Sequence, residues 1–203
     1  LSCGAGLRTT EPEKPVLTLA AIHSVMDAIH SACALREDAY RIVGTSATLV
    51  HGLDSPARDI DLLFRNRADV DRASSALAAY STSPPLFEVE NRQYFATFNV
   101  DDVDVEFSTV EWETDSDTYE CIGAGPWSHF VPLACGNVKV PVVALELRLL
   151  SEISRDREDR YLPILQHLGP RSFDRDLVLR GLADRSLTPD QPAALAALLR
   201  SGQ

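Results

Sequence analysis

The sequence of 203 residues contains no run of 18 or more apolar residues, so no segment has the composition of an ordinary membrane-spanning helix. Cysteine is scarce and scattered: Cys3, Cys33, Cys121 and Cys135 show no Cys-x-x-Cys spacing. That distribution favours neither a zinc site nor a redox motif. Dispersed cysteines are usual in a reducing compartment, so we expect a cytoplasmic protein that does not interact with membranes.

Positive charge is also scarce, with 19 Lys and Arg against 30 Asp and Glu and a net charge of −11. No Lys or Arg occurs between Gln93 and Val138, a stretch that holds nine acids and leaves 19 basic and 21 acidic residues elsewhere. The acid excess argues against a general nucleic-acid-coating protein, because such binding depends on a basic surface. The negative charge therefore belongs mainly to one region of the chain.

The composition is that of a globular protein, with 45% hydrophobic and 24% charged residues. The length fits one domain, or one domain with a small helical appendage. We expect a loose, polar lead-in over residues 1–15 and an α/β core over residues 16–141. A helical C-terminal part over residues 142–203 is expected to pack on that core.

Apolar spacing distinguishes expected helices from expected strands. Helical spacing predicts helices over residues 16–35, 46–51 and 69–80, two more between residues 142 and 168, and short ones near 172–183 and 189–200. Short apolar runs or alternation predict strands over residues 40–43, 60–64, 86–90, 93–100 and 103–110. Residues 81–85, with two prolines, are expected to break the chain, and residues 111–141 to be irregular or strand-like. The order indicates an α/β fold, a small mixed β-sheet flanked by helices with a helical C-terminal part.

Two acids in an apolar strand are the first candidates for chemistry. Asp59 and Asp61 are two residues apart, so on a strand both point to the same face. Burying two carboxylates together is costly unless a charge compensates them, and Mg²⁺ favours a few carboxylates plus substrate phosphates. A solvent-facing edge strand would explain the pair without a metal.

A later strand repeats the pattern with Asp104 and Glu106. If this strand lies beside residues 60–64, one of its acids completes a site of three carboxylates. Such a site can hold two metal ions that clamp a phosphoryl or nucleotidyl transfer. Both acids have the same strand parity, so position alone does not choose between them.

The turn at Gly44, Thr45 and Ser46 joins an expected strand to an expected helix. A helix N-terminus presents backbone N–H groups to an anion, and the glycine allows a phosphate to approach closely. The two hydroxyls can donate to the same phosphate. The simpler interpretation is an ordinary helix cap at Thr45 or Ser46, and capping is compatible with phosphate binding.

Together, Gly44-Thr45-Ser46, Asp59-Ile60-Asp61 a dozen residues later and an acid in a further apolar strand resemble the nucleotidyltransferase superfamily of polymerase beta. The resemblance is strongest to small bacterial members, which include antibiotic nucleotidyltransferases and toxin-like enzymes. It covers residues 40–110 and extends loosely to residues 141–146 and 157–159.

This resemblance implies the nucleotidyltransferase fold and a set of roles. Gly44, Thr45 and Ser46 would bind a nucleoside triphosphate, and Arg58 would replace an arginine that members often carry near this turn. Asp59 and Asp61 would bind one or two Mg²⁺ ions. Asp104, preferred over Glu106 because Val-Asp-Val fits the family pattern better, would complete the metal site and help an acceptor hydroxyl lose its proton. The nucleoside monophosphate would then pass to that hydroxyl.

The acceptor stays open between a small molecule, a transfer RNA and a protein. The acids beyond Glu106 favour a cationic small molecule or a basic protein partner. Members often have a lysine where this chain has Ser151 and Glu152, so a weakly active or inactive nucleotide- or partner-binding relative is one alternative. A toxin-like module controlled by an antitoxin-like partner is another. Arg157, on an expected helix, would contact either phosphates or its acidic neighbours.

Overall fold

The computed structural model describes residues 14–111, 116–120, 127–169 and 173–201, so most of the lead-in expected over residues 1–15 lies outside the described part. The strands are β1 (Tyr40–Val43), β2 (Ile60–Phe64), β3 (Ser81–Glu88), β4 (Gln93–Val100), β5 (Val103–Thr109), β6 (Phe130–Cys135) and β7 (Val138–Val143). The helices are α1 (Leu19–Cys33), α2 (Gly44–Val50), α3 (Arg67–Ala76), the 3₁₀ turn η1 (Ala78–Tyr80), α4 (Leu145–Ser154), α5 (Glu158–Leu168), α6 (Arg175–Asp184) and α7 (Ala193–Ser201).

The strands form one mixed sheet of seven in the order β3-β4-β5-β2-β1-β7-β6. The central strand β2 runs antiparallel to β1 and parallel to β5, while β1 runs parallel to β7. The hairpins β3–β4, β4–β5 and β6–β7 complete the two sides. This topology places Asp61 of β2 directly opposite Glu106 of β5, as the sequence-based expectation required.

The middle of the sheet is buried on both faces. The central strands β1 and β2 are nearly continuous apolar runs, which is typical of strands buried in this way. All four residues of β1 are buried. Rings line up across neighbouring strands, with centroids 4.8 Å apart for Phe64 and Phe107 and 4.6 Å apart for Phe98 and Phe107. This aromatic row fixes how β2, β5 and β4 sit against one another.

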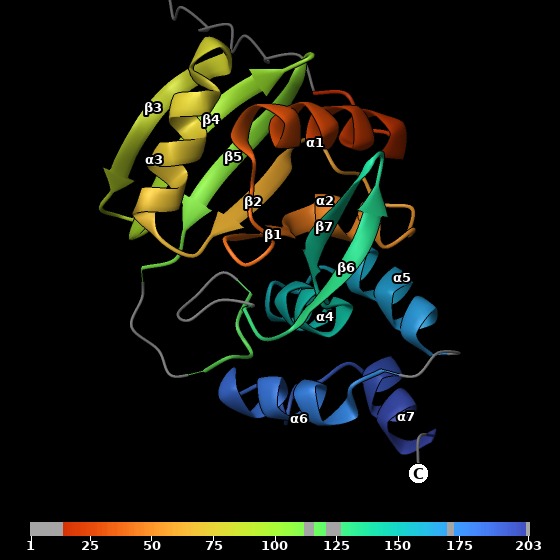
Figure 1. Cartoon of the computed structure of the whole chain (residues 1–203). Coiled ribbons are helices and arrows are strands. Elements are labelled where there is room, and N and C mark those ends of the chain that lie inside the picture. The colour runs from red at the N-terminus through yellow and green to blue at the C-terminus, as the bar shows by residue number, and fades with distance from the viewer. Residues whose placement is uncertain (1–13, 112–115, 121–126, 170–172, 202–203) are drawn as a thin grey trace, which may run out of the picture.

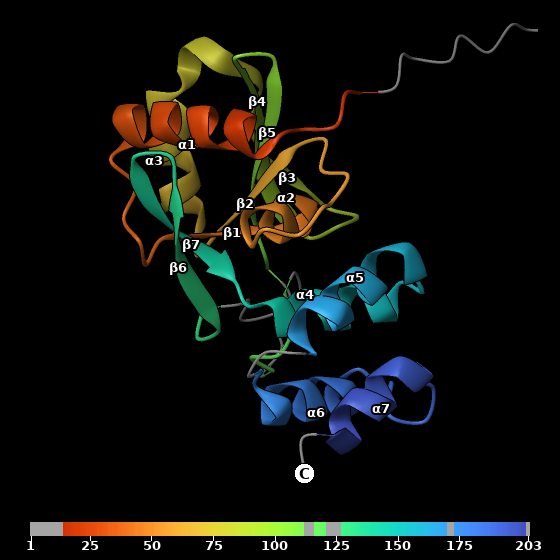
Figure 2. The same ribbon diagram turned by 90° about the vertical axis from the view of Figure 1, so that its right-hand side faces the viewer.

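The helices form two groups around the sheet (Figure 1). Helices α1 and α3 lie together across one face, whereas α4 to α7 stack beyond one end of the sheet, with α6 and α7 farthest away (Figure 2). Helix α2 contacts both α1 and α4, so it lies where the two groups meet. Among the described residues, no helix combines the length and apolarity needed to cross a bilayer.

Two local expectations were wrong. Residues 81–85 do not break the chain but begin β3, because this is an edge strand in which the two prolines need donate no ladder hydrogen bond. The register of β3 shifts on either side of Ser83, which absorbs the irregular backbone. The helix expected from Val142 begins at Leu145, because Val142 and Val143 are still paired in β7.

Candidate functional site

The site is built around the turn from β1 into α2. Gly44 has φ +65°, a conformation that residues with a side chain rarely adopt. A Cβ at this position would lie 1.9 Å from Oδ2 of Asp61. The chain therefore needs glycine here for two reasons, and the carboxylate of Asp61 packs directly against the first residue of α2.

The hydroxyl of Ser46 ties α2 to β2. Ser46 is fully buried, and its Oγ donates to the carbonyl of Val43 at 3.0 Å and accepts from the backbone N–H of Asp61 at 3.4 Å. Its side chain is thus occupied in holding the turn. Thr45 is half-buried and accepts a hydrogen bond from Nη1 of Arg160 on α5 at 3.1 Å.

Two further carboxylates lie near that of Asp61. Asp61 on β2 pairs in register with Glu106 on β5, and Asp59 lies two residues before Asp61. The pKa of Asp61 is raised to about 7, first by burial and then by the negative charges of Asp59, Glu106 and Glu120, while Arg148 opposes the rise. Burial also raises the pKa of Glu106, again with help from Asp59.

Asp104 lies two residues before Glu106 on β5, in a different environment. Its carboxylate makes an ion pair with Lys14 at 2.6 Å and accepts from Nδ2 of Asn99 at 2.9 Å. These two hydrogen bonds lower the pKa of Asp104. Glu106 lies opposite Asp61 in the strand register, whereas Asp104 is engaged by Lys14 and Asn99, so the geometry favours Glu106 as the third carboxylate.

The donor chemistry of this cluster suits a divalent metal ion. Carboxylate oxygens are the ligands that Mg²⁺ prefers, and a cation would relieve the repulsion that raises the pKa of Asp61 and Glu106. Among the described residues, no three His, Cys, Asp or Glu side chains form a ready-made metal cluster. Mg²⁺ commonly takes one or two carboxylates and completes its shell with water and substrate phosphates, so such a site closes only with substrate.

An open cavity of about 300 Å³ lies on the β5 side of the carboxylates. Its walls come from the lead-in, β3, β4 and β5, and the lining residues are Lys14, Asp59, Thr82, Thr97, Phe98, Asp104, Val105 and Glu106. Three of these are acids and one is a lysine. The cavity is large enough for a small polar molecule, and its charge is predominantly negative.

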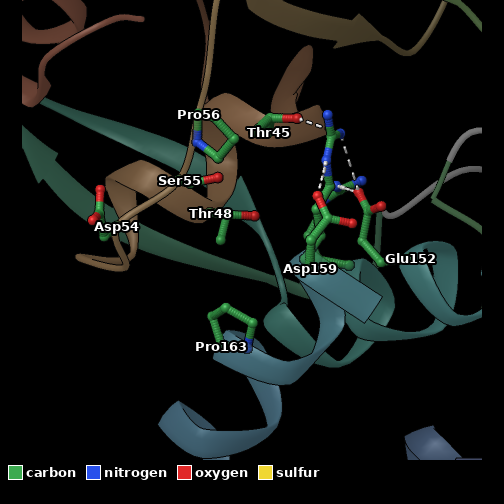
Figure 3. Close-up of a pocket in the computed structure, with 10 residues that line it drawn as sticks. Thr45, Thr48, Asp54, Ser55, Pro56, Glu152, Asp159 and Pro163 are labelled. Carbon is green, nitrogen blue, oxygen red and sulfur yellow. Dashed lines mark hydrogen bonds and ion pairs between the residues drawn. The ribbon is translucent and has the colours of Figure 1, made fainter. Parts of the chain in front are cut away.

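A second, much narrower cavity lies between α2, the loop before β2, α4 and α5 (Figure 3). Its volume of about 20 Å³ has room for little more than a water molecule. Arg160, which lines this cavity, donates to Thr45, and its guanidinium lies 4.0 Å from the carboxylates of Glu152 and Asp159 (Figure 3). Phosphate-sized ligands therefore need some rearrangement on this side.

A buried ion cluster between α2 and α4 was not foreseen from the sequence. Nη1 of Arg148 donates to both oxygens of Glu120, at 2.9 and 2.8 Å, and Nη2 pairs with Glu152 one turn along α4. All three side chains are at most 2% exposed. The spacing of Arg148 and Glu152 was a visible signal, but nothing in the sequence connects either of them with Glu120.

The remaining sequence candidates lie at the edge of the site. Arg58 is half-buried in the loop directly before Asp59. Nε of Arg157 lies 3.6 Å from the carboxylate of Asp159, which matches the expected contact with acidic neighbours. Arg160 contacts the turn directly, through the hydroxyl of Thr45.

No protein-family model matches the sequence, and no curated protein matches it significantly. Among solved structures, a proposed nucleotidyltransferase from Thermotoga maritima superposes with a TM-score of 0.56 at 14% identity, over 77% of this chain and 98% of that one. The chain has the fold of a nucleotidyltransferase. The α/β class with a mixed sheet, expected from the sequence, is thereby confirmed.

Two further structures match less closely. An antigenic nucleotidyltransferase-like protein from Paracoccidioides brasiliensis has a TM-score of 0.48 and 13% identity, over 93% of this chain and 95% of that one. A proposed nucleotidyltransferase from H. pylori has a TM-score of 0.46 and 19% identity, over 84% of this chain and 78% of that one. The fold assignment rests on the Thermotoga maritima structure.

Proposed function

We propose that the protein is a Mg²⁺-dependent nucleotidyltransferase that moves a nucleoside monophosphate from a nucleoside triphosphate to an acceptor hydroxyl. The observation that supports this most is the position of Asp61, which packs against Gly44 at the start of α2 and is repelled by Asp59 and Glu106, within a nucleotidyltransferase fold. A cluster of partly buried, mutually repelling acids is costly to fold and is therefore more typical of a functional site than of a structural core.

Each group has a role in the proposed reaction. Asp59 and Asp61 would hold Mg²⁺, which when bound neutralises the triphosphate and stabilises the charge that develops on the α-phosphate. The backbone N–H groups of the first turn of α2 would bind phosphate oxygens. Glu106, rather than the Asp104 preferred from the sequence, would accept the proton of the acceptor hydroxyl, because it lies opposite Asp61 and lines the cavity, and burial raises its pKa.

The proposed reaction forms one bond to the α-phosphorus and breaks another. The acceptor oxygen forms a bond with the α-phosphorus as its proton passes to Glu106. The bond between the α-phosphorus and the oxygen that bridges it to the β-phosphate breaks, and pyrophosphate leaves with that electron pair. The product is the acceptor joined to the nucleoside monophosphate through a phosphodiester.

The acidic cavity on the β5 side is the proposed acceptor site, since Asp59 and Glu106 form part of its wall. Its volume of about 300 Å³ accommodates a small molecule, and its acids favour a cationic one over a transfer RNA or a bulky protein surface. Lys14 now neutralises part of the wall through Asp104. A cationic acceptor would pair with the same carboxylates.

The assay is transfer of label from each of the four α-³²P nucleoside triphosphates, with Mg²⁺ and pools of cationic small molecules, transfer RNA or protein, together with pyrophosphate release. We expect transfer from at least one nucleotide, with activity lost in Asp61→Asn. Asp102→Asn is the matched control, because Asp102 is an exposed acid at the tip of the β4–β5 hairpin. Equal activity in the two variants would refute the assignment.

A second candidate is a relative that binds nucleotide without turnover. The observation that favours this candidate is the contact of Glu120 with the proposed phosphate site, where its carboxylate accepts a hydrogen bond from the backbone N–H of Gly44. Nucleotide binding with no pyrophosphate release under any of these conditions would support this candidate over the enzyme.

A further inference from the structure

The carboxylate of Glu120 occupies the start of α2, where the proposed triphosphate would bind. Oε1 of Glu120 accepts from the backbone N–H of Gly44 at 3.0 Å and from Nη1 of Arg148 at 2.9 Å. One anionic oxygen thus bridges a main-chain N–H group and a guanidinium. Proteins use the same pair of donors to hold a phosphate oxygen.

The side chain that caps α2 comes from a distant part of the chain. Helices α1, α3 and α6 are capped by the side chain of their own N-cap residue, namely Thr18, Asn66 and Asp174, whereas the N-cap residues of α4 and α5 make no such bond. Helix α2 has Val43 at this position, which offers no side-chain hydrogen bond, and its cap comes from a residue 76 positions away. A buried ion pair is also weak as a stabilising device, because desolvating both charges offsets much of their attraction.

Arg148 holds its two carboxylates with different nitrogens. Nη1 contacts Glu120, whereas Nη2 pairs with Glu152 on the same helix. Oε2 of Glu152 is buried and has no hydrogen-bond partner among the described residues, and Glu152 and Arg148 both line the narrow cavity beside Thr45. Glu152 therefore keeps the guanidinium in place if Nη1 exchanges one anion for another.

The stretch that carries Glu120 is anchored separately from the site. Oγ1 of Thr118 donates to the carboxylate of Asp184 on α6 at 2.7 Å, and the hydroxyl of Tyr119 donates to the carbonyl of the same residue at 2.7 Å. Nη2 of Arg185 donates to the carbonyl of Thr118 at 2.9 Å. These anchors hold the backbone before Glu120, so its side chain can leave Gly44 without unfolding the stretch.

We propose that Glu120 is an internal competitor of the phosphate chain, so that a ligand binds only after the Glu120 carboxylate has left Gly44 and Arg148. The backbone N–H of Gly44 and Nη1 of Arg148 then pass to phosphate oxygens, while Glu152 retains Nη2. This regulation rests on the proposed function, because the ligand in question is the triphosphate of that reaction. The test therefore uses pyrophosphate, which reports on the anion site without requiring transfer or a nucleoside.

The experiment is calorimetric titration of pyrophosphate with Mg²⁺ into the full chain and its variants. Glu120→Gln removes the competing charge at nearly constant shape, and we expect its Kd to fall about tenfold, as when a site competent in about one molecule in ten becomes fully competent. Glu120→Asp keeps the charge but shortens the reach, so it too should bind more tightly than the wild-type chain. Glu120→Asp also keeps the proposal testable if the Glu120→Gln variant does not fold.

The matched control is Asp117→Asn, which removes the same charge from the same stretch. Asp117 is half-exposed and pairs with His129, away from Gly44. We expect an unchanged Kd. Equal tightening in Asp117→Asn and Glu120→Gln would overturn the proposal, because general electrostatics would then explain the effect.

Arg148→Gln, combined with Glu120→Gln, should abolish the gain, since the phosphate then loses the donor that Glu120 releases. Wild-type affinity in Glu120→Gln and Glu120→Asp, or no binding of pyrophosphate by any of the variants, would refute the inference. Tighter pyrophosphate binding without transfer from any nucleotide would uphold it and refute the proposed transferase activity. The two failures are therefore distinguishable.

Discussion

At the scale of single residues, Gly44 is the position where the backbone is most tightly constrained by the site. Its positive φ costs about 1–3 kcal/mol for a residue with a side chain, and its Cβ would also lie 1.9 Å from the Asp61 carboxylate. We expect Gly44→Ala to lower the free energy of unfolding by more than this strain alone, measured by urea denaturation.

Gly52→Ala is the natural comparison for Gly44→Ala. Gly52 also has a positive φ, of +87°, but nothing lies within 4 Å of its added Cβ. It should therefore show the backbone strain without the clash. If both variants lose the same stability, the Asp61 carboxylate does not pack against Gly44 as described.

Asp61 should make the stability of the metal-free protein depend on pH. Its pKa is raised from 3.8 to about 7 in the folded protein, chiefly by burial, so the folded state holds the proton more tightly than the unfolded one. The resulting stabilisation is complete below about pH 4 and is lost as the pH rises to about 7. Above pH 7 the buried charge opposes folding.

Asp61→Asn should therefore raise Tm at pH 8 by about 5–10 °C in the presence of a chelator, and the gain should be smaller at pH 5. Thermal unfolding followed by circular dichroism measures both. Asp102→Asn, at an exposed turn, should change Tm little at either pH. A gain that does not depend on pH would mean that Asp61 is already ionised freely in the folded chain.

At the scale of elements, the helical layer depends on the close approach of α4 and α6. A Cβ at Gly181 of α6 would lie 2.1 Å from Cδ1 of Leu150, which is fully buried on α4. We expect Gly181→Ala to destabilise the protein by about 1–3 kcal/mol through overpacking, measured by urea denaturation.

Combining Gly181→Ala with Leu150→Ala tests the same contact. The added methyl would partly fill the space left by Leu150, so the double variant should lose less stability than the sum of the two single variants. Strict additivity would show that the two side chains do not meet.

The elements also show what a single sequence can and cannot predict. The strands over residues 40–43 and 60–64 were predicted with the observed bounds, because short apolar runs end there at a glycine or in polar residues. The start of β3 was missed because Pro84 and Pro85 indicate a break unless the strand is known to lie at a sheet edge. Edge position is a property of the assembled sheet.

The arrangement of the candidate site residues was predictable only in part, for a similar reason. The convergence of the β2 and β5 acids follows from strand parity once the strands are neighbours, and the parallel register then brings Glu106 opposite Asp61. Local residue spacing does not determine the register between strands that are distant in the sequence. Physical reasoning from the sequence therefore could not choose between Asp104 and Glu106 as the third carboxylate. The contact of Glu120 with Gly44 spans 76 positions and had no local signal at all.

At the scale of the whole molecule, the boundary expected between residues 141 and 142 has no gap in packing. Strand β7 continues through Val143, α4 packs against α2 as well as α5 and α6, and the buried contacts of Arg148 with Glu120 join α4 to the start of the core helix. A chain cut at this boundary would leave both charges of that pair without a buried partner, which is strongly destabilising. The helical part and the sheet should therefore fold as one unit.

One cooperative transition is the expected result in differential scanning calorimetry of the full chain, with equal calorimetric and van't Hoff enthalpies. Arg148→Ala should lower the midpoint of that single transition by several degrees and leave it undivided, because the lost pair destabilises sheet and helices together. Arg180→Ala is the matched control, since Arg180 is an exposed arginine on α6. It should leave the midpoint nearly unchanged. Two resolved transitions in the wild-type chain, only one of them shifted by Arg148→Ala, would show instead that the helical part is a separate folding unit that merely rests on the core.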